Sequence, residues 1–149
     1  MRFQDCIIFA KENPVCYIAT MDGYQPRVRP FRLWFADERG FYFHTATSKE
    51  VCNQMKINPK VEVCFYAPGV APDAGKMMRV TGEVEFVQNI ELKKRLLKER
   101  PFLKELVSDK PEDPLLGIVH LFKGEAYFWT MGNNMRERDV KRVRFYGGK

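Results

Sequence analysis

The 149-residue sequence lacks the features that define several large classes of protein. It has two histidines and four cysteines without a C-x-x-C pair, so the closely spaced ligands of a zinc site are missing. No stretch approaches the roughly 18 apolar residues of a membrane span. The N-terminal residues lack the long apolar run of a signal peptide, and no G-x-G-x-x-G motif of a dinucleotide-binding fold occurs. We therefore expect a single domain over residues 1–149, in the cytoplasm, without a metal site and without membrane contact.

The cysteines give little sign of chemistry. Cys6, Cys16, Cys52 and Cys64 stand singly among apolar neighbours, which is typical of buried free thiols in a reducing compartment. A catalytic cysteine would need a base close to it in space, and the sequence leaves that question open.

Positive charge is in excess, with a net charge of +6 and a basic cluster in "MRERDVKRVRFYGGK" at the C-terminus. Such a cluster attracts nucleic acid, membrane surfaces or anionic ligands. Glu137 and Asp139 partly neutralise it, and we interpret it as a solvated segment. The aromatics in "FYF", "CFY" and "YFW" fall on both alternating faces of their strands. That pattern favours a packed core over a base-stacking platform, so we expect no nucleic acid, and a nucleic-acid-binding barrel remains the less favoured alternative.

The periodicity of apolar residues predicts mostly strands. Tight turns are indicated at Asp22-Gly23 and at Lys123-Gly124. The predicted strands are a hairpin over residues 15–35, single strands over 41–45, 61–67 and 77–87, and a final hairpin over 117–131. Helices are predicted over residues 2–12, from Thr47 to 57, and over 90–106 with a break at Pro101. Six or seven strands joined by short turns, with two to four helices outside, predict a mainly β fold, an antiparallel barrel.

Polar residues gather where one strand gives way to a helix, in "FYFHTATSKEVCNQMKINPKVEVCFY". The run from Thr47 to Glu50 fits a capping box. A helix N-terminus carries free N–H groups and partial positive charge, so it is a natural anion site. Thr45, Thr47, Ser48 and Lys49 add hydroxyls and an ammonium group that would bind a phosphate. The alternative is simple capping by Thr47 with an exposed Lys49.

A second basic segment, "PRVRPFRLWF", changes the balance between these alternatives. Within a strand, Arg27 and Arg29 share one face, while Val28, Pro30 and Arg32 share the other. Because proline cannot donate to a ladder, Pro30 indicates an edge strand, a bulge, or backbone that leaves its pairing for a ligand. A basic edge beside a polar helix start favours a phosphate site.

Taken in order, four segments resemble one family: the pyridoxamine 5′-phosphate oxidase-like, FMN-binding split barrels, including their small nitroimidazole-resistance-type members. The segments are "NPVCYIATMDGYQPRVRPFRLWF", "FYFHTATSKEVCNQMKINPKVEVCFY", "RVTGEVEFV" and "GEAYFWTMGNN". The resemblance implies a split β-barrel in which the segment Arg27–Pro30 lies along the flavin. It also implies that His44 and Thr45 flank the cofactor and that Ser48 and Lys49 bind its phosphate.

The resemblance further implies a homodimer with shared flavin sites, because Trp129 matches a tryptophan that reaches FMN from the partner subunit. Two positions depart from the larger oxidases. Met77 replaces a glutamine that contacts the flavin, and "NNMRERD" replaces an R-x-H motif that grips pyridoxal phosphate. Oxidation of pyridoxamine 5′-phosphate is therefore not expected.

The function implied by the resemblance is electron transfer through FMN to or from a small organic substrate, with NADH or NADPH as candidate donors. No residue is assigned as a catalytic acid or base; His44 is either such a group or a structural histidine. A flavin carrier or redox sensor without catalysis is the alternative.

Overall fold

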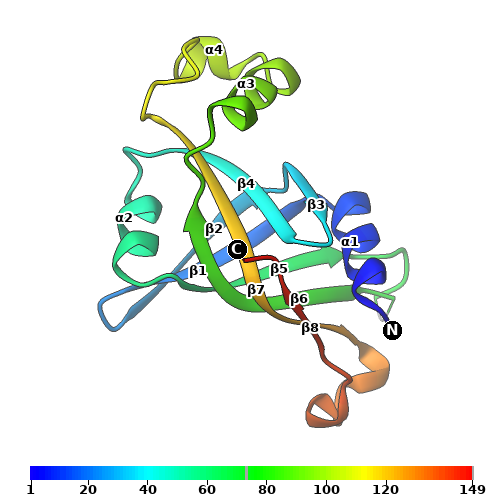
Figure 1. Ribbon diagram of the computed structural model, residues 1–149. Helices are drawn as coiled ribbons and strands as arrows, with labels where there is room; N and C mark the ends of the chain where they lie inside the picture. The colour runs from blue at the N-terminus through cyan, green and yellow to red at the C-terminus, as the bar shows by residue number, and fades with distance from the viewer. Residues whose placement is uncertain (73, 149) are drawn as a thin grey trace.

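The alternating segments of the chain form one open sheet of eight antiparallel strands, in a computed structural model that describes residues 1–72 and 74–148 (Figure 1). The strands are β1 (Val15–Asp22), β2 (Gln25–Arg32), β3 (Phe35–Asp37), β4 (Gly40–Ala46), β5 (Lys60–Ala67), β6 (Lys76–Phe86), β7 (Leu116–Thr130) and β8 (Val143–Tyr146). Their order is β2-β1-β5-β6-β7-β4-β3, with β8 paired to β7. The predicted fold class is confirmed, with more strands than the six or seven expected.

In the part of the chain that the structure describes, four helices lie outside the sheet: α1 (Phe3–Glu12), α2 (Glu50–Ile57), α3 (Ile90–Glu99) and α4 (Leu103–Leu106). Two 3-10 turns, η1 (Met131–Asn133) and η2 (Glu137–Asp139), follow β7. In Figure 1, α3 and α4 form a cap above the barrel, and the segment with both 3-10 turns projects below it. Among the described residues, no helix is long and apolar enough to cross a membrane.

The two faces of β4 bury two separate cores. Phe41 and Phe43 point into the barrel, where they belong to a cluster that includes Phe65 and Val80. Tyr42, on the other face, packs with Trp34, Leu96, Leu103 and Ile118 beneath the helical cap. The period-2 alternation of a strand thus places consecutive residues of β4 in different environments.

The predicted hairpin over residues 117–131 is wrong, because β7 is one continuous strand. Gly124 pairs with Gly82 of β6, and a side chain on Gly124 would collide with the carbonyl oxygen of Thr81. The glycine that suggested a turn instead permits a close approach of two backbones. Near it the register with β6 shifts, so the strand bends at a bulge rather than reversing.

The interpretation of the C-terminal residues as a solvated segment is only partly right. Residues 143–146 form β8, which pairs with β7 from Lys123 to Ala126. Phe145 is buried and stacks on Phe3 at a centroid distance of 4.8 Å. The end of the chain therefore closes over the barrel beside the start of α1.

Candidate functional site

The polar run before α2 does not form the predicted capping box. The helix begins at Glu50 with Lys49 as its N-cap, and no side chain caps it. Thr47 instead donates from its hydroxyl to the carbonyl oxygen of Pro114, at 2.8 Å. Its backbone N–H donates to Leu115, at 3.0 Å. Because Thr47 anchors the loop that precedes β7, the first turn of α2 keeps its N–H groups free of side-chain caps.

Ser48 and Lys49 are both exposed at this helix start. The backbone N–H of Lys49 donates to Ala46, at 3.2 Å, which fixes the tight turn between β4 and α2. The ammonium group of Lys49 has no carboxylate within ion-pair distance among the described residues. An exposed cation at a helix N-terminus is an arrangement suited to an anion.

Arg29 reaches from β2 to the same helix. Its guanidinium donates to the hydroxyl of Thr20 and to the side-chain oxygen of Gln54 in α2, both at 2.7 Å. Thr20 and Gln54 are buried and are themselves bonded at 2.6 Å. Burial, and then the neighbouring Arg27, lower the pKa of Arg29. Both partners are neutral. Arg29 therefore places a positive charge beside α2, and no carboxylate among the described residues pairs with it.

The rest of β2 is an edge strand, as Pro30 indicates. Pro30 lies opposite Tyr17, and Val28 lies opposite Ala19, on the outer face of the sheet. Arg27 is half exposed and pairs with Asp22 at 3.3 Å. The predicted site residues of this strand therefore divide into two sets: the arginines on the side of α2, and Val28 and Pro30 on the outer face.

His44 and Thr45 lie on opposite faces of β4. His44 is under the helical cap, where its ring lies 6.3 Å from the ring of Phe102. Burial, with Arg100 and Lys49 nearby, lowers the pKa of His44 to about 4. The imidazole is therefore neutral at neutral pH. This neutral state in a closed environment fits a structural or hydrogen-bonding role.

Thr45 carries the clearest sign of an incomplete site. Its side chain is buried, and its hydroxyl oxygen has no hydrogen-bond partner among the described residues. The neighbouring Cys52 thiol gives its own hydrogen to the carbonyl oxygen of Ala46 at 3.5 Å, and its sulfur offers the Thr45 hydroxyl only a weak acceptor. A buried hydroxyl without a partner costs about 1–3 kcal/mol. Such a group fits a site that a bound polar molecule completes.

Arg100 is a candidate that the sequence did not reveal. It ends α3, its Nη2 donates to the carbonyl oxygen of Leu33 at 3.4 Å, and its buried Nε has no partner among the described residues. It lies close enough to His44 to lower the pKa of that residue. The Arg-Pro step before α4 was visible in the sequence, but only as a helix break.

Trp129 lies at the opposite end of β7 from Thr45 and the start of α2. Thr45 pairs with Gly117 near the start of β7, whereas Trp129 pairs with Met77 near its end. At about 3.3 Å per residue, positions 117 and 129 lie up to about 40 Å apart along the strand. Trp129 therefore does not join Thr45 and the start of α2 within one chain.

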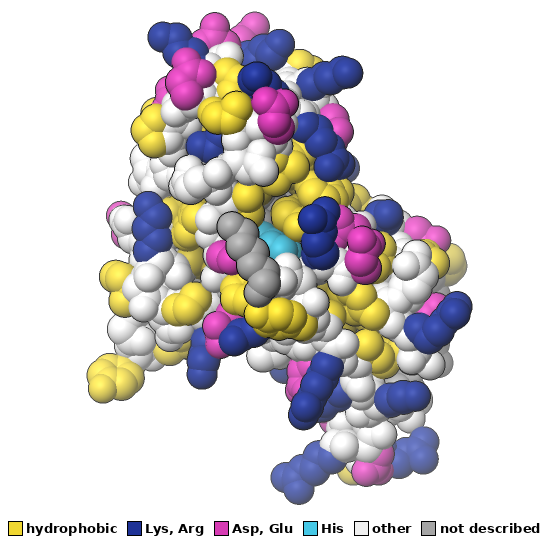
Figure 2. Space-filling model, viewed as in Figure 1, with side chains coloured by type: hydrophobic (Ala, Val, Ile, Leu, Met, Phe, Trp, Pro, Cys, Tyr) yellow, Lys and Arg dark blue, Asp and Glu magenta, His cyan; other side chains and the backbone are white. Residues whose placement is uncertain are grey.

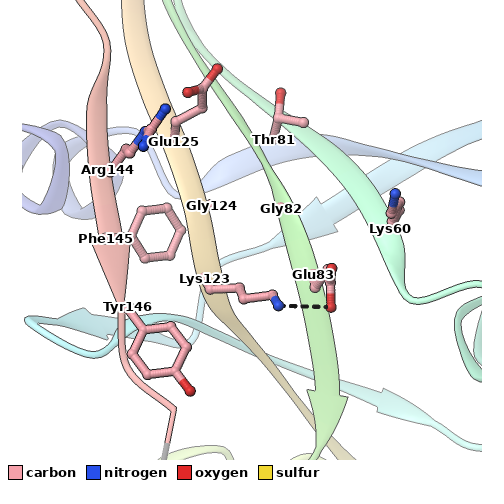
Figure 3. Close-up of a pocket in the computed structure, with 10 residues that line it drawn as sticks. All are labelled: Lys60, Thr81, Gly82, Glu83, Lys123, Gly124, Glu125, Arg144, Phe145 and Tyr146. Atoms are coloured by element: carbon pink, nitrogen blue, oxygen red, sulfur yellow. Dashed lines mark ion pairs between the residues drawn. The ribbon is translucent and has the colours of Figure 1, made fainter.

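The four thiols and the groove beside β8 do not belong to the predicted site. Burial raises the pKa of all four thiols, to about 11 for Cys6 and about 12 for Cys16, so none is a ready nucleophile. A groove of about 660 Å³ lies beside β8, with Gly82 and Gly124 in its floor and the Lys123–Glu83 ion pair across it (Figure 3). None of the predicted site residues lines this groove.

Fold and site together define an antiparallel split barrel with a basic edge strand beside a polar helix start. Residues 8–129 match the family model described as pyridoxamine 5′-phosphate oxidase. The match spans most of the chain, which therefore belongs to this family.

Solved structures agree with this assignment. A NimC/NimA family protein from Clostridium acetobutylicum is 30% identical, over 95% of this chain and 91% of that one, with a TM-score of 0.73. An FAD-binding protein from Mesorhizobium loti is 19% identical over 82% and 90% of the two chains, with a TM-score of 0.60. HutZ, a heme storage protein from Vibrio cholerae, is 14% identical over 87% and 95%, with a TM-score of 0.64. The last two show the fold alone. A comparison with curated proteins gave no match.

Proposed function

We propose that the chain binds FMN with its phosphate at the start of α2 and acts as an oxidoreductase on a small organic molecule. The observation that carries the proposal is the set of unmatched polar groups around this helix. Lys49 and Arg29 have no carboxylate partner, and the buried Thr45 hydroxyl has no partner, among the described residues. Two cations and a free hydroxyl suit a phosphate ester.

The geometry of α2 supports this assignment. Gln54, which holds Arg29, comes five residues after Lys49, which corresponds to about 7.5 Å of helix rise. Arg29 therefore lies beside α2 roughly one and a half turns from its N-cap. Lys49 and Ser48 would bind the phosphate together with the first N–H groups of the helix, and Arg29 would add long-range positive charge. Arg27 lies on the same side of β2 as Arg29 and would add a further positive charge. In the structure this charge pairs with Asp22.

FMN, when bound, supplies two-electron chemistry at its isoalloxazine ring. The chain's own residues would hold and orient it. The edge of β2 at Val28 and Pro30 would lie along the flavin, and Arg100 would add positive charge beside His44. His44 stays neutral and is not assigned a proton-transfer step.

We further propose that two chains share their flavin sites as a homodimer. Cross-strand partners share one face of a sheet, and the outer face carries the rows Pro30–Tyr17–Cys64 and Tyr66–Met77–Trp129. Tyr17 and Tyr66 are each about half exposed, at 47% and 50%. An exposed apolar face of this kind supports a protein interface. A second copy packed there would supply Trp129 to a site that its own chain cannot reach.

Oxidation of pyridoxamine 5′-phosphate is not the proposed reaction. The chain has arginine in place of histidine in the segment Arg136–Glu137–Arg138, so the donors that would select that substrate differ. We propose NADH or NADPH as the electron donor. A flavin carrier or sensor remains the second candidate, because no catalytic acid or base stands out among the described residues.

The visible spectrum of the purified protein, followed by turnover, tests the proposal. We expect flavin absorption bands, release of FMN on denaturation, and steady oxidation of NADH or NADPH with an added acceptor. Flavin bands without turnover would favour the carrier or sensor. A heme Soret band, or a protein that stays colourless and leaves FMN fluorescence unquenched, would contradict the proposal.

A further inference from the structure

The carboxylate of Glu137 connects the segment that follows β7 to the sheet. Glu137, in η2, accepts a hydrogen bond from Nη1 of Arg79 and another from the hydroxyl of Tyr127, each at 3.0 Å. Arg79 also donates to Glu62, at 2.6 Å. Glu137 thus joins the 3-10 segment to both β6 and β7.

These contacts close a loop that begins beside Trp129. Tyr127 and Glu137 lie ten residues apart in sequence, so their hydrogen bond brings the two ends of residues 127–137 together. Inside the loop, Thr130 donates from its hydroxyl to Asn133 at 3.1 Å, which fixes the chain immediately after Trp129. Figure 1 shows this segment projecting below the barrel. The other hydrogen bonds of residues 131–137 join the segment to itself and to its neighbours in sequence, so its attachment to β6 and β7 depends on Glu137.

Two guanidinium groups contact the ring of Tyr127. The guanidinium of Arg142 lies over its ring at 4.2 Å, and that of Arg79 lies at 5.5 Å. Tyr127 and Trp129 are two residues apart on one strand, so they share the outer face at a spacing of about 7 Å. Their partners on β6, Arg79 and Met77, share the same face. The Glu137 contacts therefore lie one cross-strand pair away from Trp129.

Glu137 lies in a segment that carries mostly positive charge. Lys and Arg side chains gather around the projecting segment (Figure 2). Arg136 and Arg138, on either side of Glu137, are exposed. If Glu137 were replaced by a neutral residue, Arg79 would keep Glu62 as a carboxylate partner, but the segment with Arg136 and Arg138 would lose the negative charge that faces Arg79.

We infer that Glu137 is a positioning residue that closes residues 127–137 and thereby holds Trp129 in the orientation that completes a flavin site. The part that concerns flavin rests on the proposed function. A loop ordered before binding loses less conformational entropy when its tryptophan meets the cofactor, so the closed loop raises affinity without itself touching the flavin.

The test uses the full chain labelled with 5-fluorotryptophan, whose two tryptophans give two ¹⁹F resonances. Trp129→Phe assigns them, and the buried Trp34 serves as an internal control. In flavin-free protein, Glu137→Ala, which removes the acceptor of both hydrogen bonds, should broaden or shift the Trp129 resonance and leave that of Trp34 in place. Tyr127→Phe, which removes one donor to Glu137, should give a smaller change of the same kind. Glu62→Ala is the matched control, because Glu62 shares Arg79 but does not contact the loop.

Affinity for FMN, measured by quenching of flavin fluorescence, gives the second readout. Glu137→Ala should weaken binding about tenfold, or about 1.4 kcal/mol, and Glu62→Ala should change it less than about twofold. In a Trp129→Ala background, Glu137→Ala should add no further loss, since it acts through Trp129. Additive losses, or an unchanged Trp129 resonance in Glu137→Ala, would overturn the inference. A wild-type chain that does not bind FMN would overturn the proposed function and the role in flavin binding; the ¹⁹F spectra would still decide whether Glu137 orients Trp129.

Discussion

The two ends of β7 differ in how their charged groups are paired. Near Gly117 the strand lies beside Thr45 and α2, where Lys49 has no carboxylate partner among the described residues and a buried hydroxyl is unpaired. Near Trp129 the carboxylates and guanidiniums form a network, with Arg79 bound to both Glu62 and Glu137. Groups already paired stabilise the fold, and unpaired groups are available to a ligand. Under the proposed function, the first end binds the cofactor, and the second is the scaffold that presents Trp129.

The largest expected effect comes from breaking the strand that connects these two ends. Gly124→Ala would drive a methyl group into the carbonyl oxygen of Thr81. We expect a loss of about 3 kcal/mol in the free energy of unfolding, measured by denaturant titration. Gly132→Ala is the control, because its added carbon would meet only the Thr130 hydroxyl, at 3.5 Å. Equal stability of the two variants would contradict the account of the bend in β7.

A smaller effect should appear in the pH dependence of stability near the binding end. Burial lowers the pKa of His44 from 6.5 to about 4, so the unfolded chain takes up a proton before the folded one does. The contribution of the neutral His44 to the free energy of unfolding should be fully present above about pH 6.5. It should fall as the pH drops towards 4, by on the order of 2 kcal/mol. In His44→Asn this part of the decline should be absent. Identical pH profiles for the two proteins between pH 6.5 and 4 would show that His44 does not titrate as described.

The smallest expected effect separates stability from binding at one atom. Thr45→Val keeps the shape of the side chain and removes the unpaired hydroxyl. We expect the flavin-free protein to gain up to about 1 kcal/mol in the free energy of unfolding, while affinity for FMN falls. Thermal melts with and without FMN would measure both. A variant that is less stable without FMN would mean that the hydroxyl already has a partner.

The sequence was a good guide to the class of fold and a weaker one to where glycines and hydroxyls are used. Alternating residues predicted an antiparallel sheet, and an edge strand was one of the three alternatives indicated by Pro30, because these patterns depend on local geometry. Lys123-Gly124 was misread as a turn, since a tight turn and a close approach of two strands both require glycine. Only the pairing with Gly82 distinguishes them.

The predictions for the candidate site failed where a contact is made between residues far apart in the sequence. Local spacing predicted a cap by Thr47, but its actual acceptor is Pro114, far along the chain. Arg100 was missed because its position beside His44 follows from how the helical cap folds over β4. Long-range contacts of this kind leave no pattern in a single sequence. The grouping of Lys49 with Arg29 around α2 was expected from their residue types, and the structure supplies the link through Gln54.

The central claim is that the start of α2 binds the phosphate of FMN. Its most direct test is to titrate the wild type, Lys49→Ala and Arg27→Ala with FMN and with riboflavin, which lacks the phosphate. The wild type should bind FMN much more tightly than riboflavin. Lys49→Ala should weaken FMN binding by roughly 1.5–3 kcal/mol, on the order of tenfold to a hundredfold. Arg27→Ala should weaken it less, because Asp22 already pairs with that charge, and both should leave riboflavin binding nearly unchanged. Equal affinity of the wild type for both flavins, or FMN binding unaffected by both substitutions, would contradict the account.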